Sequence, residues 1–141
     1  MKVRSFIVAA AVLVLPITAE AQKQVVAGPG INNSATLSAG VKAGDLLYLS
    51  GQTPARGDST IEGQTKSALE KMNPILAAAG TSKEKIVKCT VFLIDVKDFA
   101  GMNKAYSEFF GKEPPARSTV VVAALVVPNG KLEVECIASL K

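Results

Sequence analysis

The stretch "EPPARSTVVVAAL", residues 113–125, constrains the fold of this chain more than any other part of its sequence. A nearly continuous run of small and β-branched apolar residues follows a proline pair there, which is typical of a strand buried on at least one face. We predict a strand over residues 118–127. Arg117 stands at the start of that strand, and because a guanidinium keeps its charge in any protein site, it needs a partner.

The rest of the chain alternates between strand-like and helix-like segments. Two short extended segments flank a turn at residues 43–45, a buried strand is expected over residues 85–95, and a last strand over residues 132–139 follows the turn signal "PNG". One helical pattern precedes the strand at residues 85–95 and another follows it. The order strand, strand, helix, strand, helix, strand, strand predicts an α+β fold with a mixed sheet and both helices packed on one face.

Each helical pattern has recognisable ends. Ser59 or Thr60 can cap the first helix, and Gly80 stands where its C-terminal stop belongs. Pro74 lies inside this pattern and cannot donate a backbone hydrogen bond, so we expect a kink or a local break there. Asp98 is the expected cap of the second helix.

Residues 1–21 have the pattern of a secretory signal peptide. Lys2 and Arg4 form a basic start, an uninterrupted apolar run follows over residues 6–15, and small residues precede the expected cleavage site. A membrane anchor is the alternative, but the apolar run is about half of the roughly 20 residues that span a bilayer. We therefore expect residues 22–141 to form a single domain that is periplasmic or secreted, with no membrane contact after cleavage.

Composition excludes several classes of function. The net charge is only +4, the basic residues are scattered and aromatic residues make up 5% of the chain, so we expect no nucleic-acid partner. The sequence contains no histidine, which removes Ser-His and Cys-His nucleophile pairs and histidine metal sites. Acid–base chemistry then falls to carboxylates, tyrosine or a perturbed lysine.

Cys89 and Cys136 each lie alone inside an apolar, strand-like run. In an exported protein they could form a disulfide, which requires their Cα atoms to lie close together. Two buried free cysteines are equally compatible with this pattern. Neither cysteine resembles a metal-binding knuckle.

The period-two rule places Glu133 and Glu135 of "LEVECIA" on one face of the last strand and apolar residues on the other. The simplest interpretation is that both glutamates face water. A functional interpretation is that the turn at residues 128–130 reverses the chain and brings a glutamate onto the strand next to Arg117. The guanidinium could then clamp a substrate carboxylate while the glutamate orients a water, or the two could form a plain salt bridge.

Two further residues are candidates for a site. Asn103 is a polar residue beside the apolar stripe of the second helix, and Gly51 ends a strand where backbone N–H groups could face a ligand. A solvent-exposed amide and a simple turn glycine are the alternatives.

Several segments resemble the Rid family of reactive-intermediate deaminases, also called the YjgF/YER057c/UK114 family, in order and spacing. They cover nearly all of residues 41–141 and read "GDLLYLSGQTP", "QTKSALEKMNPILAAAG", "IVKCTVFLIDVKDFAGMNKAYSEFF", "PPARSTV" and "KLEVECIA". The resemblance implies a chorismate-mutase-like protomer that assembles as a homotrimer, with three clefts between adjacent subunits.

The resemblance also implies roles for individual residues. Arg117 matches the arginine that binds the carboxylate of a 2-imino acid, and Glu133 matches the glutamate that orients the attacking water. Ser50 and Gly51 match a segment that approaches the ligand through its backbone, and Asn103 matches a site-associated asparagine. The implied activity is that of a 2-iminobutanoate/2-iminopropanoate deaminase, which hydrolyses imines or enamines to 2-keto acids and ammonia without a cofactor.

The chain departs from the family pattern at three positions. Leu37 replaces a tyrosine that contacts the ligand, Ala39 replaces a glutamine, and Thr119 stands where many members carry a cysteine. Loss of the tyrosine favours an alternative function, a non-catalytic trimeric binder of small carboxylated metabolites. A holdase-like interaction protein is a further alternative, supported only by the general apolarity of the chain. Export is also unusual for the family, whose members mostly act in the cytoplasm or in organelles.

Overall fold

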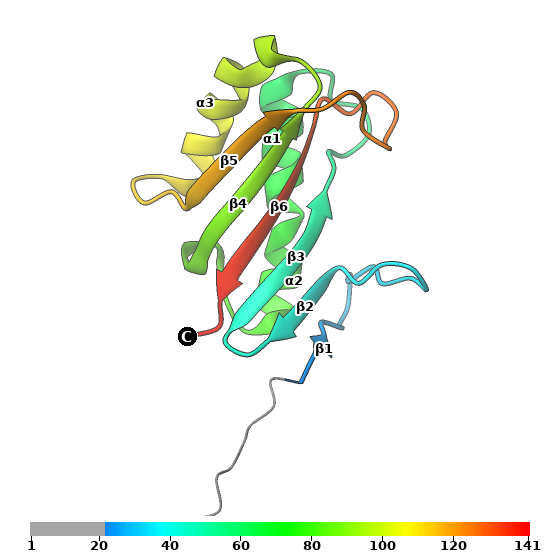
Figure 1. Ribbon diagram of the computed structural model, residues 1–141, viewed down its shortest axis with the longest axis vertical. Coiled ribbons are helices and arrows are strands. Elements are labelled where there is room, and N and C mark those ends of the chain that lie inside the picture. The colour runs from blue at the N-terminus through cyan, green and yellow to red at the C-terminus, as the bar shows by residue number, and fades with distance from the viewer. Residues whose placement is uncertain (1–21) are drawn as a thin grey trace, which may run out of the picture.

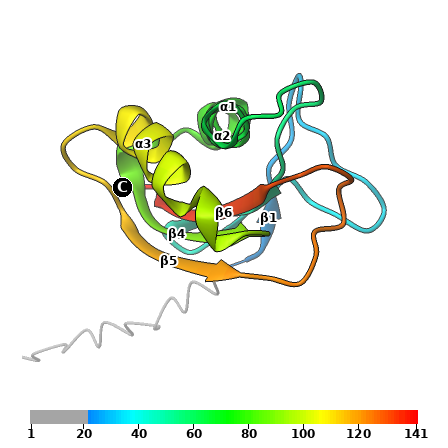
Figure 2. The same cartoon turned by 90° about the horizontal axis from the view of Figure 1, so that it is seen from above.

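The computed structural model describes residues 22–141, so the predicted signal peptide at residues 1–21 lies outside the described residues. One mixed six-stranded sheet carries its helices on a single face, and the other face is bare of helices from this part of the chain (Figures 1 and 2). The predicted α+β architecture is therefore confirmed. The strands are β1 (Gln24–Val25), β2 (Gly40–Ala43), β3 (Leu46–Gln52), β4 (Ile86–Leu93), β5 (Ala116–Val121) and β6 (Leu132–Ser139). The helices are α1 (Ile61–Glu70), α2 (Met72–Ala79) and α3 (Phe99–Phe110), with short 3-10 turns η1 (Lys83–Lys85) and η2 (Val96–Asp98).

The strand order in the sheet is β1-β2-β3-β6-β4-β5. The last strand, β6, runs antiparallel between β3 and β4, whereas β5 pairs in parallel with β4 at the edge of the sheet. The hypothesis that the turn at residues 128–130 makes β5 and β6 neighbours is therefore wrong. The crossover through α3 makes β5 parallel to β4, and the segment from residue 122 to 131 then carries the chain past β4 to the far side of that strand (Figure 1).

The strand β5 is also shorter than predicted. It ends at Val121 rather than at residue 127, because β4, its one partner among the described strands, ends at Leu93. The last contact between them is the bond that the backbone N–H of Val122 donates to the carbonyl of Leu93, at 2.8 Å. Beyond it the apolar run leaves the sheet, and Val126 is 92% exposed.

The first helical pattern forms two helices, as the position of Pro74 predicts. The helix is interrupted at Lys71, between α1 and α2, because Pro74 has no N–H to donate to the carbonyl of Glu70. Thr60 caps α1 by accepting a bond from the N–H of Gly63 at 3.2 Å. Gly80 ends α2 in the left-handed conformation, with φ 81°.

The predicted cap of α3 is not formed by its side chain. Asp98 precedes the helix, but its carboxylate makes no capping hydrogen bond and instead pairs with Lys131 at 3.2 Å. This ion pair connects the start of α3 to the start of β6. None of the helices within residues 22–141 is long and apolar enough to cross a membrane.

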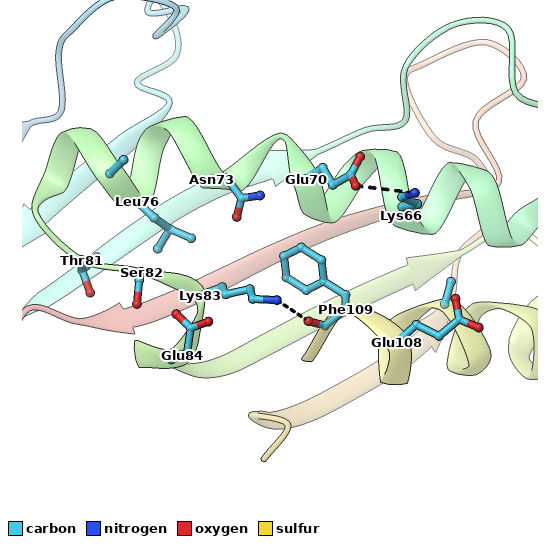
Figure 3. Close-up of a pocket in the computed structure, with 12 residues that line it drawn as sticks. Lys66, Glu70, Asn73, Leu76, Thr81, Ser82, Lys83, Glu84, Glu108 and Phe109 are labelled. Atoms are coloured by element: carbon cyan, nitrogen blue, oxygen red, sulfur yellow. Dashed lines mark hydrogen bonds and ion pairs between the residues drawn. The ribbon is translucent and has the colours of Figure 1, made fainter. Parts of the chain in front are cut away.

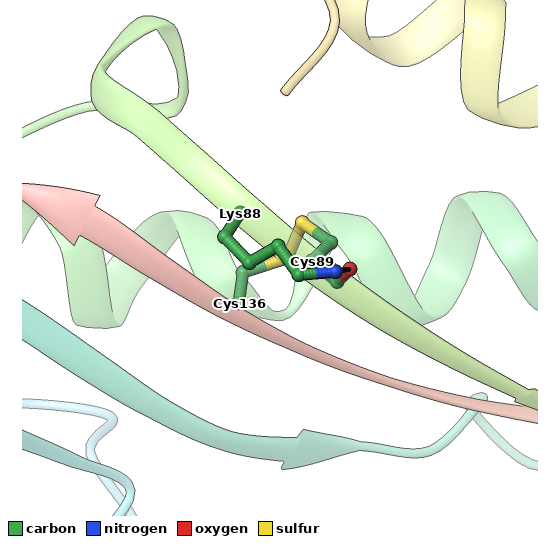
Figure 4. Close-up of a disulfide and its surroundings, with 3 residues drawn as sticks. All are labelled: Lys88, Cys89 and Cys136. Atoms are coloured by element: carbon green, nitrogen blue, oxygen red, sulfur yellow. Dashed lines mark hydrogen bonds between the residues drawn. A yellow bond between two sulfur atoms is a disulfide. The ribbon is translucent and has the colours of Figure 1, made fainter. Parts of the chain in front are cut away.

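Cys89 and Cys136 lie directly opposite each other in the antiparallel pair β4–β6 and form a disulfide, with their Cα atoms 4.1 Å apart (Figure 4). Both side chains are buried on the helix-covered face, which answers the question left open by the sequence. Lys88 precedes Cys89 and points to the opposite face, where its Nζ donates to Ser118 Oγ at 2.8 Å.

Candidate functional site

Arg117 lies on β5 and points toward α3. Its Nη2 donates a hydrogen bond to Asn103 Oδ1 at 2.6 Å, and its Nη1 lies 3.7 Å from Met102 Sδ. The guanidinium carbon lies 4.6 Å from the centre of the Tyr106 ring. The helix α3 brings these three partners to one side because they occupy positions within one turn of it. The structure therefore joins two of the predicted site residues, Arg117 and Asn103.

No carboxylate neutralises Arg117 within the described chain. The ion pairs among residues 22–141 are Lys66–Glu70, Lys131–Asp98 and Lys141–Asp45. Two of the five N–H groups of Arg117 have partners, and both partners are uncharged. The side chain is half-buried, so its charge is held close to the protein surface with N–H groups left for another acceptor.

A hollow of about 400 Å³ opens beside this guanidinium. It is lined by Asn103, Tyr106, Ser107, Gly111, Pro114, Pro115 and Arg117. Arg117 is the only charged side chain in this lining. The hollow is therefore suited to a small anion with an uncharged body.

Tyr106, which is not among the site residues predicted from the sequence, forms a wall of this site. The residue is 4% exposed, and its hydroxyl has no hydrogen-bond partner among the described residues. Burial raises the pKa of the Tyr106 phenol to about 12, and the positive charge of Arg117 opposes part of that rise. The phenol is thus neutral over the whole physiological range. Its spacing of three residues from Asn103 is the sequence signal that could have identified it.

Glu133, Ser50 and Gly51 form a second group, where the end of β3 lies beside the start of β6 in the interior of the sheet. The carboxylate of Glu133 lies against Gly51 so closely that any Cβ at position 51 would overlap it. The pairing of β3 with β6 shifts register between Leu49 and Gln52, so that Ser50 and Gly51 bulge out of the regular ladder. The missing side chain of Gly51 thus gives the glutamate access to the backbone of the bulge.

Ser50 is held by the loop that precedes β2. Its Oγ donates to the carbonyl of Ser38 at 2.6 Å, and its backbone N–H donates to the carbonyl of Ala39 at 3.0 Å. The same loop carries Leu37, which is 53% exposed. Leu37 occupies the position of the tyrosine in the family pattern. It therefore lies on the loop that holds this second group, and its apolar side chain faces solvent.

The two groups of site residues are on opposite faces of the sheet. Arg117 is in register with Cys89 of β4, whose side chain is buried under the helices. Glu133 is in register with Phe92 of the same strand, an odd number of residues away, and therefore projects from the bare face. Glu135 shares that face, as the alternation predicted. A single protomer does not bring Arg117 and Glu133 together.

A larger hollow, of about 590 Å³, lies between the α1–α2 rod and α3 (Figure 3). None of the predicted site residues lines it. Its two lysines already have partners, because Lys83 Nζ donates to the carbonyl of Phe109 at 2.8 Å and Lys66 lies 3.9 Å from Glu70. Within residues 22–141 no three histidine, cysteine or acidic side chains are grouped as metal ligands. We therefore place the candidate site at Arg117 rather than in this larger hollow.

Comparisons with known proteins agree with the fold. The family model described as endoribonuclease L-PSP matches residues 30–140. The chain is 40% identical over 119 residues to the mitochondrial protein mmf2 of Schizosaccharomyces pombe, with 76% of this chain and 94% of mmf2 covered. It is 40% identical over 109 residues to the chloroplastic Reactive Intermediate Deaminase A of Arabidopsis thaliana, with 73% of this chain and 58% of that protein covered. The solved structure of YyfA from Yersinia pestis, of the Rid protein family, has a TM-score of 0.77 and 33% identity, and covers 84% of this chain and 99% of YyfA.

Proposed function

Since the chain belongs to the endoribonuclease L-PSP family, also called the YjgF/Rid/UK114 family, we propose that it hydrolyses reactive 2-imino acids to 2-keto acids and ammonia. One relative, 40% identical, carries the name Reactive Intermediate Deaminase A. Ribonuclease chemistry, which the description of the family model names, has little support in a sequence without histidine and without a basic stripe.

The observation that carries this proposal is that Arg117 is half-buried without a carboxylate partner among the described residues. A half-buried guanidinium with uncharged partners, beside a hollow that holds no other charge, is a binding site for a carboxylate. A 2-imino acid offers that carboxylate directly next to its reactive carbon. Binding at Arg117 would therefore place the imine group within the same small site.

We propose that the complete site lies between two protomers of a homotrimer. The guanidinium group, with Asn103, would come from one protomer, and Glu133 with Ser50 and Gly51 from the bare sheet face of its neighbour. This bare face includes Tyr48, which is 44% exposed, so its large side chain can pack against a neighbouring protomer. A closed ring would make each cleft from the same two surfaces.

The reaction is a hydrolysis in which each group of residues has one role. Arg117 holds the substrate carboxylate, and Glu133 accepts a proton from water as the oxygen bonds to the protonated imine carbon. The glutamate returns this proton to the nitrogen, the carbon–nitrogen bond breaks to release ammonia, and the hydroxyl proton passes to the glutamate as the carbonyl of the 2-keto acid forms. No oxidant or reductant is needed, because the imine carbon and the keto carbon have the same oxidation state.

A non-catalytic carboxylate binder is the second candidate. The observation that favours it is the exposed side chain of Leu37, which offers no hydroxyl where the family pattern has a tyrosine. Such a protein would retain the carboxylate site at Arg117 and lack the hydrolytic step.

We also propose that the chain acts outside the cytoplasm. The pattern of residues 1–21 and the disulfide between Cys89 and Cys136 support this independently, because disulfides persist in oxidising compartments and are rare in the cytosol.

One experiment separates the two candidate functions. A 2-imino acid is generated in situ from its amino acid with an amino-acid oxidase and catalase, and its decay is followed with wild type, Arg117→Ala and the control Arg56→Ala. Arg56 is an exposed arginine in a loop outside the hollow, so Arg56→Ala measures the effect of losing one positive charge away from the site. Faster decay with wild type and Arg56→Ala than with Arg117→Ala is expected. A different result would leave only the binding function. In that case the imine decays no faster with wild type than in buffer, while pyruvate raises the melting temperature of wild type and not that of Arg117→Ala.

A further inference from the structure

Four side chains of α3 surround the guanidinium of Arg117, and the most distant is Phe99, whose ring centre lies 5.9 Å from the guanidinium carbon. Met102 Sδ and Asn103 Oδ1 contact its two terminal nitrogens at 3.7 and 2.6 Å, and Tyr106 presents the face of its ring to the guanidinium carbon at 4.6 Å. Asn103 constrains one edge of the planar group, whereas the ring constrains its face. The two contacts are therefore complementary, since neither alone fixes both the direction and the plane of the guanidinium.

The ring of Tyr106 is itself fixed in place. It is 4% exposed and packs against Phe110, with the ring centres 4.6 Å apart at an interplanar angle of 45°. A buried ring that packs against a second ring cannot easily swing away from Arg117. Its hydroxyl, in contrast, has no hydrogen-bond partner within residues 22–141 and is shielded from solvent. The contact that Tyr106 makes with the site is thus through the ring and not through the oxygen.

We propose that Tyr106 is a positioning residue whose ring face holds the guanidinium of Arg117 ready for a ligand carboxylate, and that its hydroxyl is dispensable for this role. An arginine that is already ordered loses less rotamer freedom on binding, and the cation–π contact stabilises the ordered form. The ligand part of this inference rests on the proposed function, whereas the ordering of Arg117 does not.

The ordering is tested first in the unmodified protein by NMR. The Nε–Hε signal of Arg117, assigned by its loss in Arg117→Lys, is expected to be shifted upfield by the ring and to show an NOE to the Tyr106 ring protons. Tyr106→Phe is expected to keep both features and to retain or raise the melting temperature, because it removes a buried hydroxyl without a partner. Tyr106→Leu, which keeps an apolar side chain without a π face, is expected to lose most of the upfield shift, because only the more distant ring of Phe99, at 5.9 Å, then remains.

Ligand binding is measured on the same variants. Tyr106→Leu is expected to raise the Kd for pyruvate by about 3- to 10-fold, and the KM for an imine by a similar factor with kcat changed less than about 2-fold. The matched control is Phe109→Leu, which removes a ring on the same helix that lies 4.8 Å from Lys83 instead of Arg117. This control is expected to leave the Arg117 signal and the Kd unchanged.

Three outcomes decide the inference. An Arg117 signal without an upfield shift in the unmodified protein overturns it. A Tyr106→Phe variant as impaired as Tyr106→Leu also overturns it, because the hydroxyl would then carry the effect. If the unmodified protein binds no carboxylate and hydrolyses no imine while the ring-dependent shift is present, the proposed function fails and the positioning of Arg117 by Tyr106 stands.

Discussion

Arg117 and Glu133 project from opposite faces of the same sheet, because Arg117 is in register with Cys89 and Glu133 with Phe92 of the intervening strand β4. Cys89 is buried beneath the helices, so the guanidinium shares the helix-covered side and the carboxylate the bare side. If both residues act on one ligand, they come from different protomers.

Complementation between two inactive variants tests this arrangement. Arg117→Ala and Glu133→Ala are each expected to be inactive, but trimers assembled from an equal mixture should recover activity in about one quarter of their clefts. Those clefts take Arg117 from one variant and Glu133 from the other. The control is a mixture of separately assembled trimers that have not exchanged subunits. A co-assembled mixture no more active than this control would show that the two residues do not share a cleft.

Gly51→Ala is expected to reduce activity with little loss of stability. The new methyl group would displace the flexible end of the Glu133 side chain rather than the backbone. A misplaced general base is expected to lower kcat by about 10- to 100-fold, as steady-state kinetics would show. Gly63→Ala is the matched control, since its methyl group displaces the carboxylate of Asp58, away from the site. Equal activity of Gly51→Ala and wild type would remove Glu133 from the mechanism.

Loss of the disulfide is expected to lower the free energy of unfolding by about 2–4 kcal/mol, because the bond closes a long loop between β4 and β6. The two cysteines are 47 positions apart in the sequence. Urea denaturation of wild type with and without reductant, compared with the double variant Cys89→Ala and Cys136→Ala, measures this difference. The reductant should have no effect on the double variant. A midpoint for wild type that does not depend on the reductant would contradict a stabilising disulfide.

Stability is expected to fall between pH 10 and pH 12 because of Tyr106. Burial raises the pKa of its phenol from 10.0 to about 12 in the folded chain. Below pH 10 the phenol is protonated in both states and contributes no pH dependence. Between the two pKa values the unfolded chain has released the proton and the folded chain has not, so the free energy of unfolding falls with rising pH, by roughly 2–3 kcal/mol in total.

The phenolate absorbance of a Tyr48→Phe variant measures this titration, because the sequence contains two tyrosines and Tyr106 is then the one that remains. Tyr106→Phe should remove this part of the alkaline destabilisation, measured by denaturation at several pH values. Titration of Tyr106 near pH 10 in the folded protein would contradict a buried phenol.

Local patterns in the sequence predicted most of the elements and several of their ends. Thr60, Gly80 and Pro74 act as the sequence predicts, because capping, left-handed backbone and the missing proline N–H are properties of a few neighbouring residues. Asp98 does not cap its helix as predicted, because Lys131, 33 residues away, binds its carboxylate. The prediction of a cap took no account of a partner so distant in the chain.

By itself, the sequence determined the set of elements, the alternation that separates Glu133 from the apolar side of its strand, the absence of histidine chemistry and the family resemblance. Only the tertiary structure decided that β6 lies between β3 and β4, that Cys89 meets Cys136, and that Arg117 contacts Asn103 and Tyr106. The physical reason is that residue periodicity reports which face of an element is buried. The choice of neighbouring strand depends on crossovers and long loops, which no local pattern encodes.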